Sequence, residues 1–286
     1  MSHALFQTSS LLSAAGVAHG FSLRGGGAST GAFASLNLSR AVGDDPGAVE
    51  ENLARLARAG GLSGGAAFAT AAQVHGDRVL IARQGRLEEL LGPSEPQAPV
   101  SGELSAAPSQ DAAVKAAAEV AGDAVVSLDR GVAAAVRAAD CVPVLLYEPR
   151  ARAAAAVHAG WRGARLSVAG RGVRALALCA GAEPALVLAA VGPCIGRCCY
   201  EVSRELAALF RGRFGDHVAD DPAGATAPHL DLRACVEASL RRAGLGPGRI
   251  EQVGGCTACD PDHYFSHRRD RGRTGRHLAF VVPDGP

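Results

Sequence analysis

Long apolar segments and a basic leader are both missing from this chain of 286 residues. No apolar run approaches the roughly 20 residues that a transmembrane helix requires. The N-terminal stretch MSHALFQTSSLLSAAGVAHG also lacks the basic start and the apolar centre of a signal peptide. We therefore expect no membrane partner and a cytoplasmic location.

An excess of charge of either sign is missing as well. The 29 Lys and Arg residues nearly balance the 28 Asp and Glu residues, which leaves a net charge of +1. Proteins that bind nucleic acid or anionic lipid usually carry a marked positive excess, so we expect neither partner. The eight cysteines should be mostly reduced in the cytoplasm, and a disulfide framework is not the expected explanation for them.

What the chain does contain is enough apolar sequence for a substantial core. Apolar segments with strand propensity are separated by short turns in 122–140 and 142–157, and this spacing favours antiparallel pairing over a doubly wound parallel sheet. Helical patterns are expected over 47–59, 163–180 and 232–243. The sequence therefore predicts an α+β fold with a mixed, largely antiparallel β core flanked by helices.

The most informative stretch is ADCVPVLLYEPRARAAAAVHAGWRG, residues 139–163. Two apolar strands flank a turn with Pro149 at its second position. If the hairpin is centred between Pro149 and Arg150, residues whose numbers sum to 299 face each other, which pairs Cys141 with His158. Their Cβ atoms would then be about 5 Å apart on one face of the sheet.

A thiolate and an imidazole at this separation suit two kinds of chemistry. They can share a metal ion, since Zn–S bonds are about 2.3 Å and Zn–N bonds about 2.0 Å long. They can also act as a nucleophile and its general base. A buried thiol beside a structural histidine is the alternative without chemistry, but Asp140 before the cysteine and the polar exit after the histidine favour a functional site.

Two further segments have the composition of ligand-binding loops. The glycine-rich loop FSLRGGGASTGAF (21–33) carries Arg24 at its entrance, and its backbone amides are suited to an anion such as phosphate. It matches neither standard nucleotide-binding fingerprint. In AAQVHGD (71–77), His75 is expected at the end of a strand, where it can project into a cleft.

Several motifs in one order carry a family resemblance. They are FSLRGGGASTGAFASLNLS (21–39), QVHGDRV (73–79), ADCVPVLL (139–146), VHAGWRG (157–163), GPCIGRCCYEV (192–202) and HYFSHRRDRGRTGRHLAFV (263–281). Together they resemble the YfiH/FAMIN family, formerly called polyphenol oxidases or laccases, over nearly the whole chain. The resemblance implies one catalytic domain, residues 1–286, of the CNF/YfiH-like cysteine-hydrolase type. From its composition, rich in Pro, Ser, Ala and Glu without an apolar period, we expect the segment 92–120 to be a mobile surface insertion, longer than the family pattern leads us to expect.

The resemblance also implies an activity and a set of residues. Members of this family resemble zinc-dependent purine nucleoside phosphorylases with adenosine deaminase activity, so the expected partners are purine nucleosides and inorganic phosphate. By motif, the zinc ligands are His75, Cys141 and His158. These three and Asp140 are the expected catalytic residues, and the expected substrate-binding residues are Arg24, Arg162, Phe265 and Arg268.

Three other functions remain open at this point. A metal-free hydrolase would use Cys141 as nucleophile and His158 as base, for example on amide bonds of cell-wall precursors. A copper oxidase is less expected, because the nine histidines contain no His-x-His pair. The third possibility is a binding module without catalysis.

The remaining cysteines have no role that the sequence can assign. Cys194, Cys198 and Cys199 lie in one loop, and Cys256-Thr-Ala-Cys259 lies in another. A C-x-x-C pair with C-x-x-x-C-C is a weaker sign of zinc than two C-x-x-C knuckles. The pattern therefore favours structural loops over a second metal site.

Overall fold

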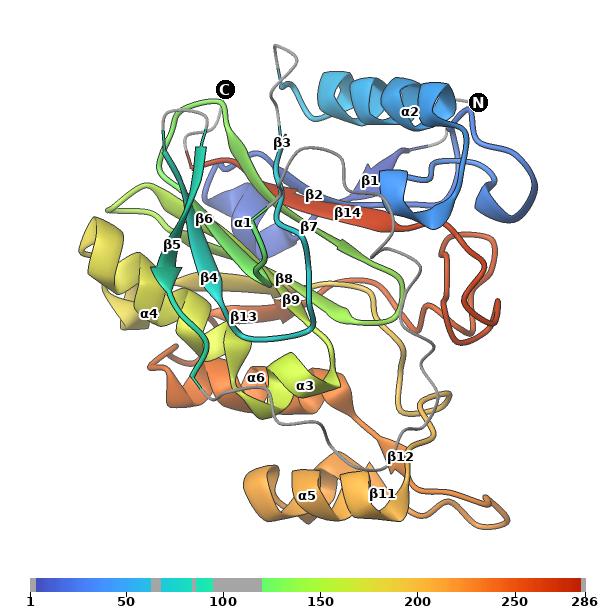
Figure 1. Ribbon diagram of the computed structural model, residues 1–286. Helices are drawn as coiled ribbons and strands as arrows, with labels where there is room; N and C mark the ends of the chain where they lie inside the picture. Colours follow the sequence, from blue (N-terminus) through green and yellow to red (C-terminus); the bar gives the residue numbers. More distant parts are fainter. Residues whose placement is uncertain (1–3, 63–67, 84–85, 95–119, 284–286) are drawn as a thin grey trace.

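Two stacked β-sheets form the centre of the computed structural model, which describes residues 4–62, 68–83, 86–94 and 120–283 (Figure 1). The larger sheet has the order β13-β10-β8-β9-β6-β4-β5 and the smaller one β1-β2-β14-β7-β3. The strands of the larger sheet are β4 (Val79–Arg83), β5 (Arg86–Leu91), β6 (Ala124–Ser127), β8 (Val142–Glu148), β9 (Ala153–Ala159), β10 (Leu188–Val191) and β13 (Ile250–Gln252). Those of the smaller sheet are β1 (Phe6–Gln7), β2 (His19–Ser22), β3 (Phe68–Ala69), β7 (Ala133–Ala138) and β14 (His277–Val281).

Antiparallel pairing dominates both sheets. Among the described strands, the parallel pairs are β10 with β13, β3 with β7 and β4 with β6, and the other pairs are antiparallel, including the small separate ribbon of β11 (Ala219–Asp220) and β12 (His229–Leu230). This arrangement confirms the predicted mixed, largely antiparallel β core.

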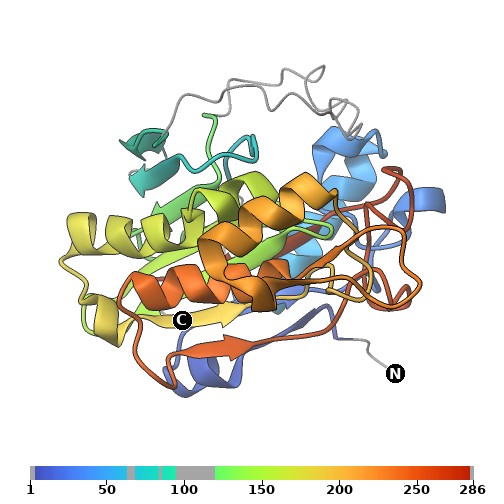
Figure 2. The ribbon, with the colours of Figure 1, turned by 90° about the horizontal axis from the view of Figure 1, so that it is seen from below.

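Helices cover the outer faces of the two sheets. Figure 1 shows α2 over the smaller sheet, and Figure 2 shows α4 and α6 in front of the larger sheet, on the face turned away from the smaller sheet. The helices are α1 (Ser10–Ala14), α2 (Pro46–Ala59), α3 (Trp161–Arg165), α4 (Val168–Ala180), α5 (Arg204–Phe214) and α6 (Leu232–Arg242). An aspartate caps the N-terminus of both α2 and α6. The Asp45 carboxylate accepts a hydrogen bond from the amide of Ala48, and the Asp231 carboxylate accepts one from the amide of Ala234.

Alternation along the central hairpin connects these layers. In β8, Val144 and Leu146 face the helices, while Leu145 and Tyr147 face the smaller sheet. In β9, Val157 faces the helices, while Ala154 and Ala156 face the smaller sheet. The small alanine side chains allow the two sheets to approach each other. Both faces of this hairpin are therefore buried, and only its ends can carry an accessible site.

The register of this hairpin differs from the prediction. Pro143 pairs with His158 and Glu148 with Ala153, so facing residues sum to 301 and not to 299. The turn holds four residues, 149–152, because the Glu148 carboxylate accepts hydrogen bonds from the amides of Arg150 (3.1 Å) and Ala151 (2.6 Å) and widens it. Since the shift is two residues, Cys141 and His158 remain on one face as diagonal neighbours.

Three other expectations about local structure are wrong. The segments 122–128 and 132–140 do not form a hairpin, because β6 belongs to the larger sheet and β7 to the smaller one. The strand expected before His75 is reduced to Phe68–Ala69. The single helix expected over 163–180 is two helices, α3 and α4, separated at Ser167, whose φ is 60°. Residues 95–119 of the expected insertion lie outside the described residues.

No helix in the described part of the chain combines the length and the apolar character that crossing a membrane would require.

His277 makes the stability of the fold sensitive to acid. It is 7% exposed at the start of β14, and its Nε2 accepts a hydrogen bond from the amide of Phe265 (2.8 Å). Burial, more than any other influence, lowers its pKa from the usual 6.5 to about 3. The unfolded chain therefore binds one more proton than the folded chain between these values, so the free energy of unfolding falls as the pH falls from about 6.5 toward 3.

We expect His277→Gln to remove this part of the acid sensitivity, because glutamine does not titrate and its side-chain oxygen can accept the same hydrogen bond. Denaturant unfolding at pH 7 and pH 4.5 should show a stability loss smaller by about 2 kcal/mol than in the wild type. The exposed His217 supplies the control, since His217→Gln should keep the full loss. Equal losses in all three proteins would contradict this interpretation.

Candidate metal and active site

Three side chains from distant parts of the sequence converge at one end of the hairpin. Cys141 directly precedes β8, His158 lies in β9 and His75 lies in the turn before β4. One donor atom from each lies within 4.8 Å of the others. The two imidazole rings are edge to face, with centroids 4.9 Å apart and an interplanar angle of 79°. The structure thus brings together the three residues that were predicted as metal ligands.

Asp123, directly before β6, holds this arrangement in place. Its carboxylate is fully buried and accepts hydrogen bonds from the amides of His75 (2.9 Å) and Gly76 (2.7 Å) and a longer one from that of Val74 (3.3 Å). It also contacts His158 Nδ1 at 2.9 Å. One carboxylate therefore fixes the turn that carries one histidine and the ring of the other.

The same contact decides which nitrogen of His158 is available. Burial favours the neutral carboxyl, but the hydrogen bond and charge of His158 and the amide of Gly76 lower the pKa of Asp123 below its usual value. An ionised Asp123 accepts a hydrogen bond from Nδ1–H, which makes Nε2 the nitrogen that can bind a metal ion once it has lost its proton. This is the carboxylate–histidine arrangement that commonly orients metal ligands.

The local charges favour a thiolate at Cys141. Burial opposes ionisation, but the positive charge of His158 and hydrogen bonds from His158 and His75 lower the pKa of Cys141. The pKa of His158 is correspondingly raised, despite burial, by the Cys141 thiolate and by Asp123. The pair is thus prepared for thiolate chemistry, either as a metal ligand or as a nucleophile.

The donor set fits a metal ion. Tetrahedral zinc with bonds of 2.0 to 2.3 Å separates neighbouring donors by about 3.3 to 3.8 Å, so small shifts of the three side chains suffice. Gly160 provides the room: a Cβ atom there would lie 2.9 Å from His75 Cδ2 and 3.1 Å from Cys141 Sγ. Three protein ligands leave a fourth position for a reactant, which is the pattern of a catalytic site.

Asp140 has a less direct relation to this site than predicted. Its backbone φ is 98°, a conformation that residues other than glycine rarely adopt. Its carboxylate accepts hydrogen bonds from Thr257 Oγ1 and from the amide of Arg268, both at 2.6 Å. Its carbonyl accepts one from the amide of Ile195 (2.9 Å). Asp140, which directly precedes Cys141, therefore links two loops to this end of the hairpin, and its catalytic role stays a prediction.

Arg24 and Phe265, two predicted substrate contacts, pack against each other. Arg24 donates to the carbonyls of Ala34 (2.7 Å) and Pro261 (3.0 Å), and its guanidinium lies 5.1 Å from the centre of the Phe265 ring. The Phe265 side chain is 0% exposed. In this conformation Arg24 closes the glycine-rich loop onto the C-terminal loop, and Phe265 offers no exposed face to a purine base.

Arg162 and Arg268 are better placed for a substrate. Both are exposed, and both lie within electrostatic range of Tyr200, whose pKa is raised first by burial and then by the negative charge of Cys141. Arg268 stacks over the Tyr200 ring at 5.2 Å and donates to the carbonyl of Glu201 (3.1 Å). These two arginines give the rim of the site its positive charge.

The sequence interpretation gave too little weight to three residues at this site. For Asp123 the sequence leaves open whether this strand-end carboxylate orients a histidine, acts as a general acid or base, or only caps its turn. Tyr200 in the motif RCCYEV and His267 in FSHRRD had been given no role. Burial and Arg276 lower the pKa of His267, and smaller effects of Asp140 and His75 place it within electrostatic range of the site. The only sequence signal for these two residues was a polar or aromatic side chain inside a motif of the family resemblance.

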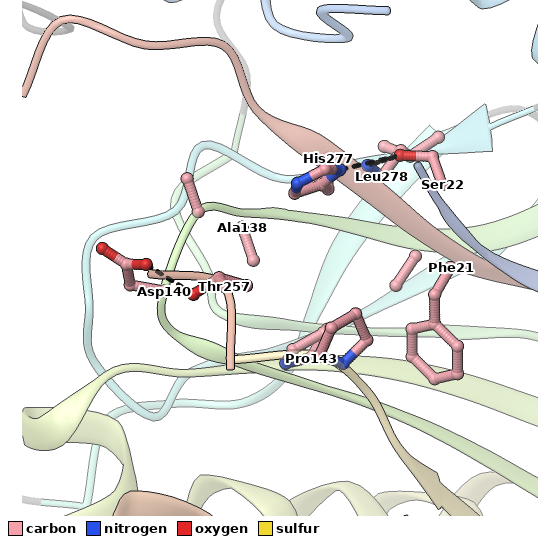
Figure 3. Close-up of a pocket in the computed structure, with 11 residues that line it drawn as sticks. Phe21, Ser22, Ala138, Asp140, Pro143, Thr257, His277 and Leu278 are labelled. Atoms are coloured by element: carbon pink, nitrogen blue, oxygen red, sulfur yellow. Dashed lines mark hydrogen bonds between the residues drawn. The ribbon is translucent and has the colours of Figure 1, made fainter. Parts of the chain in front are cut away.

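A small cavity lies beside Asp140, and its lining residues do not include the three converging ligands (Figure 3). Phe21, Thr257 and His277 are among the residues that line it, and its volume is about 10 Å³. That volume holds one water molecule at most. The cavity is therefore too small for a nucleoside, whereas His75 is exposed to solvent beside the other two ligands.

Fold and site together define an α+β protein with two stacked sheets and a His, Cys, His cluster at a strand end. Comparison with known proteins gives the family: residues 18–284 match the family model described as multi-copper polyphenol oxidoreductase laccase, and the chain belongs to this family. The resemblance found in the sequence motifs is thereby confirmed.

Relatives with assigned names are similar over nearly the full length. A purine nucleoside phosphorylase of Streptomyces coelicolor is 38% identical over 274 residues, which cover 94% of this chain and 96% of the relative. One of Deinococcus radiodurans is 38% identical over 266 residues, 93% of this chain and 88% of the relative. The crystal structure of YlmD from Geobacillus stearothermophilus is 30% identical with a TM-score of 0.79, covering 97% and 98% of the two chains. That of Bacillus licheniformis YfiH is 29% identical with a TM-score of 0.78, covering 93% and 92%.

Gly160 offers a test of the metal site that leaves the ligands unchanged. Its φ of −72° is accessible to alanine, so Gly160→Ala should fold, but the added methyl group would displace His75 and Cys141. We expect metal affinity to fall by at least about 10-fold, as when ligand orientation is lost. Competition with a chromogenic chelator measures this.

The matched control is Gly212→Ala in α5, where an added Cβ would have nothing within 4 Å. It should bind metal as the wild type does, and both variants should unfold near the wild-type temperature. Wild-type metal affinity in Gly160→Ala would contradict the proposed position of the ion.

Proposed function

We propose that this protein is a zinc-dependent purine nucleoside phosphorylase that also deaminates adenosine. The observation that carries the proposal is the convergence of His75, Cys141 and His158 with one coordination position left open. The names of the relatives at 38% identity support the phosphorylase activity. The proposed substrates are adenosine, inosine, guanosine and methylthioadenosine, together with inorganic phosphate.

Zinc suits the donor set better than copper, despite the description of the family. Blue copper sites add a weak axial ligand, usually methionine, to two histidines and a cysteine. The only methionine of this chain is Met1, which is not among the described residues. Within those residues, the groups that could hold a metal ion are this cluster and one of four cysteines. Neither is the histidine-rich set that a multi-copper oxidase requires.

For phosphorolysis the chain has to hold phosphate against the ribose and protonate the departing base. The C1′–N9 bond breaks, a bond from C1′ to a phosphate oxygen forms, and the purine gains a proton. Arg162 and Arg268 are exposed cations suited to orienting the phosphate. His75, which is exposed beside the thiolate, and His267 are candidates for moving the proton.

Deamination replaces the 6-amino group of adenosine with oxygen from water and releases ammonia. When bound, zinc supplies the Lewis acidity that makes water a nucleophile near neutral pH. Asp123 contributes by holding His158 through Nδ1 and by fixing the His75 turn. We assign Asp140 to the loop connections around the site, with direct proton transfer as the alternative role.

A second candidate function follows from one specific contact. Asp123, His158 and Cys141 are arranged as an orienting carboxylate, a base and a nucleophile, and the pKa of Cys141 is lowered. A metal-free hydrolase acting on amide bonds, such as those of cell-wall precursors, would use this order. Loss of one zinc ion per chain on the change Cys141→Ala would count against it, whereas an acyl group trapped on Cys141 would favour it.

We expect Cys141→Ala to lose the zinc of this site and the phosphate-dependent release of free base together, because one of three ligands is gone. Metal analysis and a base-release assay over the four nucleosides measure the two effects, and circular dichroism checks folding. Cys179→Ala, at a thiol outside both cysteine-containing clusters, should behave as the wild type. Full activity in a Cys141→Ala protein without metal would exclude the proposal.

A further inference from the structure

Four cysteines that the proposed reaction does not use meet at the surface. Cys198 and Cys199 come from the segment between β10 and α5, and Cys256 and Cys259 from the segment after β13. All four sulfur atoms lie within 4.8 Å of one another. Cys259 Sγ is 3.5 Å from Cys198 Sγ and 3.4 Å from Cys199 Sγ. The two segments are about 60 residues apart in sequence, so the fold itself brings the thiols together.

These distances match a single metal ion better than disulfides. A disulfide requires sulfurs about 2.05 Å apart, whereas zinc with four Zn–S bonds of about 2.3 Å holds its sulfurs about 3.8 Å apart. Four sulfurs within 4.8 Å surround one ion and leave no room for a multi-iron cluster between them. Because all four positions are filled by thiolates, such a site is closed and structural.

The backbone around the cluster is already arranged for thiolate ligands. The amide of Gly196 donates to Cys256 Sγ at 3.1 Å. Gly196 also leaves space, since a Cβ there would lie 3.1 Å from Cys256 Cβ and 3.2 Å from Cys198 Sγ. Amides directed at a cysteine sulfur stabilise its ionised, metal-binding form.

The two loops are also joined directly beside the cluster. Cys194 and Cys256 form an isolated parallel bridge, and the amide of Thr257 donates to the carbonyl of Cys194 at 3.0 Å. The loop positions of the four thiols are thus set by backbone pairing as well as by the side chains. A metal ion would bind to a largely preformed site.

We propose that Cys198, Cys199, Cys256 and Cys259 bind one zinc ion in a structural site separate from the His75, Cys141, His158 cluster. The ion joins the loop before α5 to the loop after β13. Thr257, which holds the Asp140 carboxylate, and Tyr200, which stacks under Arg268, each directly follow one of its ligands. The second ion thereby stabilises the loops that surround the first site, whatever reaction takes place there.

The test counts zinc in protein expressed with zinc, purified under reducing conditions without added metal, and freed of any histidine tag. We expect two zinc ions per wild-type chain, one in Cys141→Ala, one in the double variant Cys198→Ser/Cys259→Ser and two in the control Cys179→Ser. X-ray absorption at the zinc edge of Cys141→Ala should show four sulfur ligands at about 2.3 Å. This absorption measurement tests the four-cysteine zinc site even if the double variant fails to fold.

Two results would overturn the proposal. One is Cys141→Ala protein without zinc, or with zinc bound to nitrogen or oxygen. The other is a wild-type mass lower by two hydrogens per cysteine pair with no second zinc, which would identify the cluster as disulfide-forming. Neither result affects the purine nucleoside activity, whose own test is the base-release assay, so the two proposals can fail independently.

Discussion

The buried carboxylate of Asp123 is the group on which the geometry of the site depends. It accepts hydrogen bonds from the amides of the His75 turn and holds Nδ1 of His158. The backbone carbonyl of Asp123 also accepts a hydrogen bond from the amide of His158, at 2.7 Å. Two ligands from segments about 80 residues apart are thereby fixed to one side chain. A charged group in a dry interior is stable only when it is fully paired, so the need to satisfy this carboxylate forces the ligands together.

The sheets determine where this constraint acts. β8 and β9 are buried on both faces, by the helices on one side and by the smaller sheet on the other, so an accessible site can form only at their ends. The chain places Cys141 directly before β8, and Gly160 directly after β9 leaves room beside it. The four-cysteine cluster then lies in the loops that Asp140 connects to this end of the hairpin. Both candidate metal sites therefore belong to one continuous loop system.

The sequence predicted features that local physics determines and missed those that depend on the stacking of the sheets. The helices expected over 47–59 and 232–243 are present, and so is the hairpin that brings Cys141 to His158. The register error came from Glu148, whose carboxylate widens the turn, but a two-residue shift preserves the face. No local signal shows that β6 and β7 lie in different sheets, or that four cysteines from two loops converge. The position of His75 followed only from the family resemblance, because its distance to Cys141 is set by the buried Asp123.

The most direct test of this account is the zinc affinity of Asp123→Asn. The asparagine has the same shape, but its amide NH₂ would face an N–H donor from the His75 turn or from His158. We predict a loss of about 10- to 100-fold in zinc affinity at the His75, Cys141, His158 site. A melting temperature that still shows cooperative unfolding would establish that the fold is retained. Wild-type zinc affinity in the folded variant would contradict the claim that this carboxylate assembles the site.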